Sequence, residues 1–172
     1  MVNVEIIKIG LGEIEQLQNI GRKTFVETFA SVNSEENMQK YLEESYSREI
    51  LTTELTNPNA EFYFAKHGNT VLGYLKINLG LAQTENKNHN ALEIERIYVL
   101  EEFQGRQVGQ ILFQTALNIA KDRDAEYLWL GVWEENAKAI KFYKKNGLVE
   151  FDKHIFRLGD DEQTDIMMKL IL

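Results

Sequence analysis

The segment LEIERIYVLEEFQGRQVG, residues 92–109, is the strongest indication of the fold in the sequence. Its first half is rich in β-branched residues and predicts a strand from Ala91 to Leu100, and its second half is a short turn that contains two glycines. A helical stripe of apolar residues then runs from Gly109 to about Arg123, and residues 127–132 form a nearly continuous apolar strand, typical of burial on both faces of a sheet. Strand, turn, helix and strand in this order predict a βαβ unit with a right-handed crossover.

Antiparallel strands are expected on both sides of this unit. Residues 61–67 and 70–79 are rich in aromatic and β-branched residues and are joined by the turn signal Gly68-Asn69. The C-terminal part predicts a second antiparallel pair, residues 149–158 and 164–172. Further helices are expected from about residue 10 to 30, after the N-cap residues Ser34 and Ser47, and from Asn136 to about Asn146. We therefore predict an α/β fold (an α+β mixed sheet) that is mostly antiparallel, has helices on both faces, and forms a single domain over residues 1–172.

Composition and charge exclude several functions. The chain has 19 Lys and Arg against 27 Asp and Glu, a net charge of −8, which disfavours nucleic acid or an anionic membrane and favours a small cationic ligand. No window approaches the roughly 18 apolar residues of a membrane span, and the N-terminus does not resemble a signal peptide, so we expect a cytoplasmic protein. Cysteine is absent and the three histidines are scattered, so we expect no metal site.

The turn between the predicted strand and helix is a candidate anion site. Several main-chain amides between Gly105 and Gln110 lack an intrahelical partner, and they lie at the positive end of the helix dipole. Such an arrangement suits a phosphate or pyrophosphate. The alternative is that Gly105 and Gly109 only permit a tight turn.

A second stretch, WLGVWEENAKAIKFYKKNGL at residues 129–148, places Asn136, Ile140 and Tyr143 near one helix face. A partly buried phenol that faces a cleft can donate a proton to a leaving group, which makes Tyr143 a candidate acid. Two structural alternatives stay open: Tyr143 belongs to the core with its hydroxyl at the rim, and Asn136 serves only as a helix N-cap.

The two stretches together resemble the acetyl-CoA site of the GNAT N-acetyltransferase superfamily. Within it, the chain is similar to the PaiA-type spermidine/spermine N-acetyltransferases in LEIERIYV, in WLGVWEENAKAIKFYKKNG, in GDDEQTD near the C-terminus, and in Thr24-Phe25, Thr28-Phe29 and NSEENMQKYLE. The resemblance extends from about Glu61 to the C-terminus for the superfamily motifs. It implies a GNAT-like fold and acetyl transfer from acetyl-CoA to an amine, without a metal.

The resemblance also assigns site residues. It implies that the strand end hydrogen-bonds the pantetheine arm, that the turn holds the pyrophosphate through main-chain amides, that Asn136 contacts the cysteamine end, and that Tyr143 protonates the departing thiolate. Lys145 is a candidate phosphate contact. The full set of expected cofactor-binding residues is Ile97, Tyr98, Val99, Gln104, Gly105, Arg106, Gln107, Val108, Gly109, Gln110, Asn136, Tyr143 and Lys145.

One residue departs from the family pattern. The fourth position of the Gln-x-x-Gly-x-Gly turn is usually glycine, and this chain has Gln107. If the position requires a positive φ, glutamine costs on the order of 1 kcal/mol. If it requires close approach of a phosphate, cofactor affinity is reduced instead.

Amine acetylation also needs a base, because a primary alkylamine with a pKa near ~10.4 is almost entirely protonated at pH 7. Glu93 and Glu95 lie two residues apart on the predicted strand and share a face, and we favour Glu95 because it is nearer the strand end. The alternative is a carboxylate that is merely solvated or compensated by Arg96. A polyamine needs several separated carboxylates, and the candidates outside the cofactor motifs are Glu27, Glu36, Glu43, Glu95, Asp160 and Asp161.

The leading hypothesis is thus an acetyl-CoA-dependent N-acetyltransferase that acts on a small cationic amine, most simply a polyamine such as spermidine or spermine. Two alternatives remain open: acetylation of a protein or peptide amine, and a noncatalytic module that binds acyl-CoA for regulation. A homodimer is possible, but no residue specifies how it would form.

Overall fold

The computed structural model describes residues 3–85 and 88–172, and this part of the chain forms a seven-stranded mixed sheet in the order β1-β2-β3-β4-β5-β7-β6. The β4–β5 pair is parallel and the other neighbours are antiparallel, which confirms the predicted fold class. The strands are β1 (Glu5–Ile9), β2 (Ala60–His67), β3 (Thr70–Leu79), β4 (Ala91–Val99), β5 (Tyr127–Trp133), β6 (Val149–Leu158) and β7 (Asp161–Ile171). The α-helices are α1 (Ile14–Phe29), α2 (Glu35–Ser45), α3 (Arg48–Thr56), α4 (Val108–Asp122) and α5 (Ala137–Lys145).

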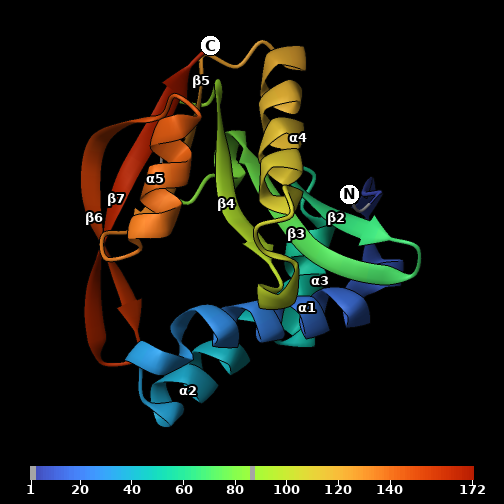
Figure 1. Ribbon diagram of the computed structural model, residues 1–172, viewed down its shortest axis with the longest axis vertical. Helices are drawn as coiled ribbons and strands as arrows, with labels where there is room; N and C mark the ends of the chain where they lie inside the picture. The colour runs from blue at the N-terminus through green and yellow to red at the C-terminus, as the bar shows by residue number, and fades with distance from the viewer. Residues whose placement is uncertain (1–2, 86–87) are drawn as a thin grey trace.

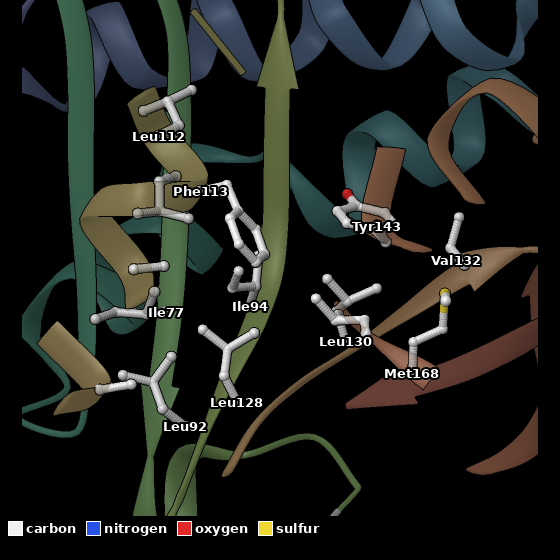
Figure 2. Close-up of a cluster of buried hydrophobic side chains, with 14 of the residues drawn as sticks. Ile77, Leu92, Ile94, Leu112, Phe113, Leu128, Leu130, Val132, Tyr143 and Met168 are labelled. Carbon is white, nitrogen blue, oxygen red and sulfur yellow. The ribbon is translucent and has the colours of Figure 1, made fainter. Parts of the chain in front are cut away.

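Helices cover both faces of the sheet, as Figure 1 shows. On one face, Leu112 and Phe113 of α4 and Tyr143 of α5 pack with the strand residues Ile94 and Leu130, a cluster drawn in Figure 2. The other face packs α1, α2 and α3 against β2 and β3 through a second cluster rich in aromatic side chains. Each helix presents one apolar stripe, so the sheet lies between two separate cores.

The helix starts confirm the predicted caps. Ser34 accepts a hydrogen bond from the Asn37 amide at 3.1 Å, and Ser47 accepts one from the Ile50 amide at 3.2 Å. One predicted boundary is wrong: β7 begins at Asp161 and not at Thr164. The ladder continues to the pair Leu158↔Asp161, which leaves a tight two-residue turn instead of a longer acidic loop.

The centre of the sheet contains an irregularity that the strand pattern hid. Opposite β3, Lys76 pairs with Arg96 and Ile77 pairs with Ile94, so Glu95 is an extra residue in β4. Such a β-bulge bends the strand and increases its local twist. The parallel ladder between β4 and β5 stops at Ile94↔Leu130, immediately before the bulge, although both strands continue further. The two strands therefore part at Glu95.

The turn before α4 has two residues with positive φ. Gly105 has φ +75°, and Gln107, which is the residue before α4, has φ +66° and ψ +6°. Gln107 thus occupies the left-handed region that disfavours residues with a Cβ. The positive φ supports the explanation that glycine is usual at this position because of its backbone conformation.

Replacing Gln107 with glycine is expected to stabilise the fold. Relief of the left-handed strain outweighs the extra freedom of glycine in the unfolded chain, so Gln107→Gly should raise the free energy of unfolding by about 0.5 to 1 kcal/mol. Gly105→Ala should lower it by about 1 kcal/mol, through φ strain alone because an added Cβ meets no atom of the described residues within 4 Å. Urea unfolding followed by circular dichroism measures both changes, and a Gln107→Gly protein less stable than the parent would contradict the strain.

Candidate active site

The opening between β4 and β5 is the centre of the candidate site. Beyond Ile94, no strand of the described residues lies beside the edge of β4 that faced β5, because β5 continues in its ladder with β7. Ile97, Tyr98 and Val99 lie on this open edge, and Gln104 reaches back so that its Nε2 donates to the Val99 carbonyl at 3.2 Å. An extended ligand with amide groups can pair with such an edge as an added strand would.

The turn that follows β4 offers main-chain donors at the N-terminus of α4. Ile111 donates to the Gln107 carbonyl at 3.0 Å, and the amides of Val108, Gly109 and Gln110 precede this first helical bond. Of the atoms in residues 3–85 and 88–172, a Cβ built on Gly109 would meet only Val99 Cγ2, at 3.9 Å. Space for a ligand atom is therefore open against this backbone, so the turn fits a phosphate or pyrophosphate group.

The remaining predicted residues of the turn lie on its outer surface. Arg106 is exposed, and its guanidinium lies over the Phe103 ring with 5.8 Å between the guanidinium carbon and the ring centroid. Gln104 is also exposed and accepts a hydrogen bond from Lys138 Nζ at 3.1 Å. Both side chains can contact a bound phosphate from the solvent side, whereas the main chain lies beneath it.

Tyr143 lies in α5 on the same face of the sheet as α4. The residue is 8% exposed, and Figure 2 shows its hydroxyl directed away from Val132 and Met168. Among the residues that the structure describes, the phenol has no hydrogen-bond partner. Its oxygen is not one of the fully buried polar atoms, so it retains contact with solvent. Burial raises the pKa of the phenol above its ordinary value, so it stays protonated at neutral pH and can act as a proton donor.

The two ends of α5 carry the other predicted residues. Asn136 is the N-cap of α5. Its Oδ1 atom accepts a hydrogen bond from the Ala139 amide at 3.2 Å, which confirms the alternative that this atom serves as a helix cap. Its Nδ2 group is not used by the cap and can still donate to a ligand. Lys145 is exposed in the last turn, and within residues 3–85 and 88–172 it forms no ion pair.

The carboxylates Glu93 and Glu95 lie on the face opposite to Tyr143, toward α1 to α3. Asn78 Nδ2 donates to both, at 2.9 Å to Glu93 Oε1 and 3.3 Å to Glu95 Oε2, so the predicted shared face is confirmed. Glu93 is only 3% exposed and also accepts from the Thr84 amide and hydroxyl. Burial raises its pKa despite these hydrogen bonds. Glu95 is the more accessible of the two, with 21% of its side chain exposed.

Glu95 belongs to a network of charges that sequence reasoning missed. Its carboxylate contacts Lys76 Nζ, and Lys76 also lies 3.2 Å from Glu54, which Arg96 holds through two hydrogen bonds of 3.0 and 3.3 Å. Burial raises the pKa of the Glu95 carboxyl, but Arg96 and Lys76 outweigh burial and hold it below its ordinary value. Glu95 is therefore ionised throughout the neutral range.

The acidic acceptor candidates are not gathered in one place. Glu27 accepts from the Glu101 amide at 2.8 Å, and Glu43 accepts from Gln39, so both make local contacts. The structure does bring the first turn of α2 to the turn between β6 and β7, because Asn37 donates to Asp160 at 2.7 Å. That hydrogen bond shows that the helix turn carrying Glu36 meets the turn carrying Asp160 and Asp161.

Two further findings concern metals and membranes. Across the described ranges, no group of three or more His, Cys, Asp or Glu side chains is arranged to hold a metal ion. His154 instead contacts Glu85 at 2.5 Å and Asp165 at 3.4 Å. Among the same residues, no helix combines the length and the apolar character that crossing a bilayer requires.

Comparison with known proteins agrees with this geometry. A model of the acetyltransferase (GNAT) family matches residues 17–148. The chain is 41% identical over 172 residues to an uncharacterized N-acetyltransferase of Lactobacillus delbrueckii subsp. lactis from the pepI 3′ region, with 100% of this chain and 99% of the relative covered. It is 26% identical over 172 residues to the spermidine N(1)-acetyltransferase of Thermoplasma acidophilum, with 98% and 97% covered.

A solved structure shows the same architecture. The crystal structure of the PaiA N-acetyltransferase from Thermoplasma acidophilum in complex with coenzyme A matches this fold with a TM-score of 0.81 at 25% identity, over 99% of each chain. The family model spans well over half of the chain, and the Lactobacillus relative spans its full length. The chain therefore belongs to the GNAT family and is an acetyl-CoA-dependent N-acetyltransferase.

Proposed function

We propose that the acceptor is a primary amine of a small cationic molecule, in particular a polyamine such as spermidine or spermine. The net charge of −8 attracts such a molecule. The name of the Thermoplasma relative, a spermidine N(1)-acetyltransferase, supports the same substrate class. We assign the binding of the ammonium groups that do not react to Asp160, Asp161 and Glu36, on the two turns that meet through the bond between Asn37 and Asp160.

One observation carries the proposed reaction: the opening between β4 and β5 has a carboxylate on one side and a phenol on the other. Glu95 lies at the bulge on the α1–α3 face, and Tyr143 lies on the α4–α5 face. A thioester held in the opening would have its carbonyl carbon between these two groups. An amine can then approach from the Glu95 side while the sulfur departs toward Tyr143.

Acetyl-CoA supplies the activated acyl group, and the chain supplies proton transfers and orientation. Glu95, directly or through a water, accepts one proton from the ammonium and leaves a neutral amine. The amine nitrogen forms the new bond to the carbonyl carbon as the carbon–sulfur bond breaks. Tyr143 gives its proton to the sulfur and regains one from the nitrogen, which loses its second proton. The products are an acetamide, a free thiol and one proton released to solvent.

The cofactor is held at a distance from the reacting atoms. We assign the pyrophosphate to the main-chain amides of residues 105–110 and the pantetheine arm to Ile97, Tyr98 and Val99. Asn136 Nδ2 would bind the cysteamine end, and Lys145 and Arg106 would contact phosphates from the solvent side. Because these contacts lie away from the thioester, they bind cofactor and transition state alike and set affinity more than rate.

Loss of the Tyr143 hydroxyl is expected to lower the rate but not cofactor binding. Tyr143→Phe should reduce kcat with spermidine by about 100-fold, because general acid catalysis contributes at least that much, and should change the Kd for coenzyme A less than twofold. Thiol release from acetyl-CoA, followed with a thiol-reactive chromophore across a panel of amines and peptides, measures the rate. The chain has no cysteine and gives no background in this assay.

Tyr63→Phe is the matched control, since Tyr63 bonds to Glu61 on β2 away from the opening. It should keep the kcat of the parent. Turnover with a peptide amine and none with polyamines would assign the chain to protein acetylation. Coenzyme A binding with no acceptor-dependent turnover would indicate a regulatory module.

Glu95 generates a prediction for the pH dependence. Since its pKa is lowered, Glu95 stays ionised in the neutral range, where the amine is still protonated, so both reacting forms predominate and kcat/KM should show almost no slope between pH 6 and 8. Glu95→Gln should lower kcat/KM by about 100-fold at pH 6 and should introduce a rising slope, because only amine that has already lost its proton can then react.

Glu43→Gln, an exposed change on α2, should leave both the rate and the slope unaltered. An acid limb between pH 6 and 7 that disappears in Glu95→Gln would show that Glu95 titrates near neutrality, against the ion pairing described above. Equal rates for Glu95→Gln and the parent would remove Glu95 from the mechanism.

A further inference from the structure

The phosphate-binding turn and α5 are joined by two side chains that take no part in the proposed proton transfers. Gln110, in the first turn of α4, forms a reciprocal pair with Asn146, the residue that caps the C-terminus of α5. Gln110 Nε2 donates to Asn146 Oδ1 at 2.8 Å, and Asn146 Nδ2 donates to Gln110 Oε1 at 3.2 Å. Both contacts are partly buried, so water competes less for these groups than at the surface.

The orientation of the pair follows from the backbone of α5. Asn146 Nδ2 also donates to the Phe142 carbonyl at 3.0 Å, and a carbonyl can only accept. This bond fixes which side of the Asn146 amide faces Gln110. The Asn146 main-chain amide in turn donates to the carbonyls of Phe142 and Tyr143, at 3.1 and 3.0 Å. Asn146 therefore connects Gln110 directly to the backbone that carries Tyr143.

The other end of α5 has a weaker connection to the same turn. Lys138, in the first turn of α5, donates to Gln104 at 3.1 Å, but both side chains are exposed. Between the two ends, the Phe113 ring of α4 contacts Phe142 and Tyr143, with ring centroids 6.0 and 6.4 Å apart. Apolar ring contacts permit sliding, whereas a reciprocal amide pair specifies one register.

We propose that Gln110 and Asn146 are positioning residues that hold α5 at a fixed distance from the phosphate-binding turn and thereby place the Tyr143 hydroxyl on the departing sulfur. The inference rests on the proposed role of Tyr143 as the acid. A cofactor anchored at the turn reaches the opening with a length set by its own chemistry. The protein must hold its proton donor at the matching distance from the turn, and the amide pair fixes the separation between α5 and the turn.

The test compares the same substitutions in two backgrounds. Gln110→Ala and Asn146→Ala should each lower kcat about tenfold in the parent, since a displaced acid is a poor donor. In the Tyr143→Phe background, each should lower kcat less than twofold, because the hydroxyl that they position is already absent. The Kd for coenzyme A, measured by calorimetry, should change less than twofold. A general distortion of the fold would reduce kcat by the same factor in both backgrounds.

Gln114→Ala is the matched control. Gln114 lies on α4 one turn after Gln110 and is exposed, and within the part of the chain that the structure describes its side chain bonds only to Asn118 of its own helix, at 2.9 Å. It should keep the kcat of the parent. Urea unfolding of all variants checks that Asn146→Ala, which also removes a helix cap, remains folded at the assay temperature.

The possible outcomes distinguish the positioning role of Gln110 and Asn146 from the acid role of Tyr143. Equal losses in both backgrounds, or no loss in the parent, would overturn the positioning role while the acid role of Tyr143 stands. If Tyr143→Phe itself keeps the kcat of the parent, the acid role is wrong and the positioning role falls with it.

Discussion

The parting of β4 and β5 is the constraint on which the site depends. A parallel pair that stayed in register would satisfy its own backbone groups and leave no room for a ligand between the strands. The extra residue at Glu95 bends β4 away after the pair Ile94↔Leu130, and a backbone edge with unused hydrogen-bonding groups results. The same bulge places a carboxylate at the point of separation, so the opening and its proposed base have one structural cause.

The surroundings of the opening divide the chemistry between two faces. The α4–α5 face is apolar around Tyr143, which keeps the phenol protonated, and its helix N-terminus provides the anion-binding amides. The α1–α3 face contains the positive charges of Lys76 and Arg96, which keep Glu95 ionised. A protonated donor and an ionised acceptor at the same pH follow from these two environments, without a histidine or a metal.

Much of the fold was predictable because its signals are local. Ser34 caps a helix through its own neighbours, and the turn at residues 104–110 lies between a strand and a helix that periodicity identifies. The bulge also had a signal: the apolar residues of one face are Leu92, Ile94, Ile97 and Val99, so their spacing changes once from two to three. The charge network had none, because its members come from α3, β3 and β4 and meet only through the topology. The same holds for the pair of Gln110 and Asn146.

The most direct test follows the main-chain amides during a titration with coenzyme A. In a nitrogen-15-labelled protein, the account predicts that the largest chemical-shift changes occur at Gly105 to Gln110 and at Ile97 to Val99, and that changes on β1 and β2 are small. Coenzyme A at millimolar concentration that leaves both segments unshifted, or that shifts β1 and β2 instead, would contradict it.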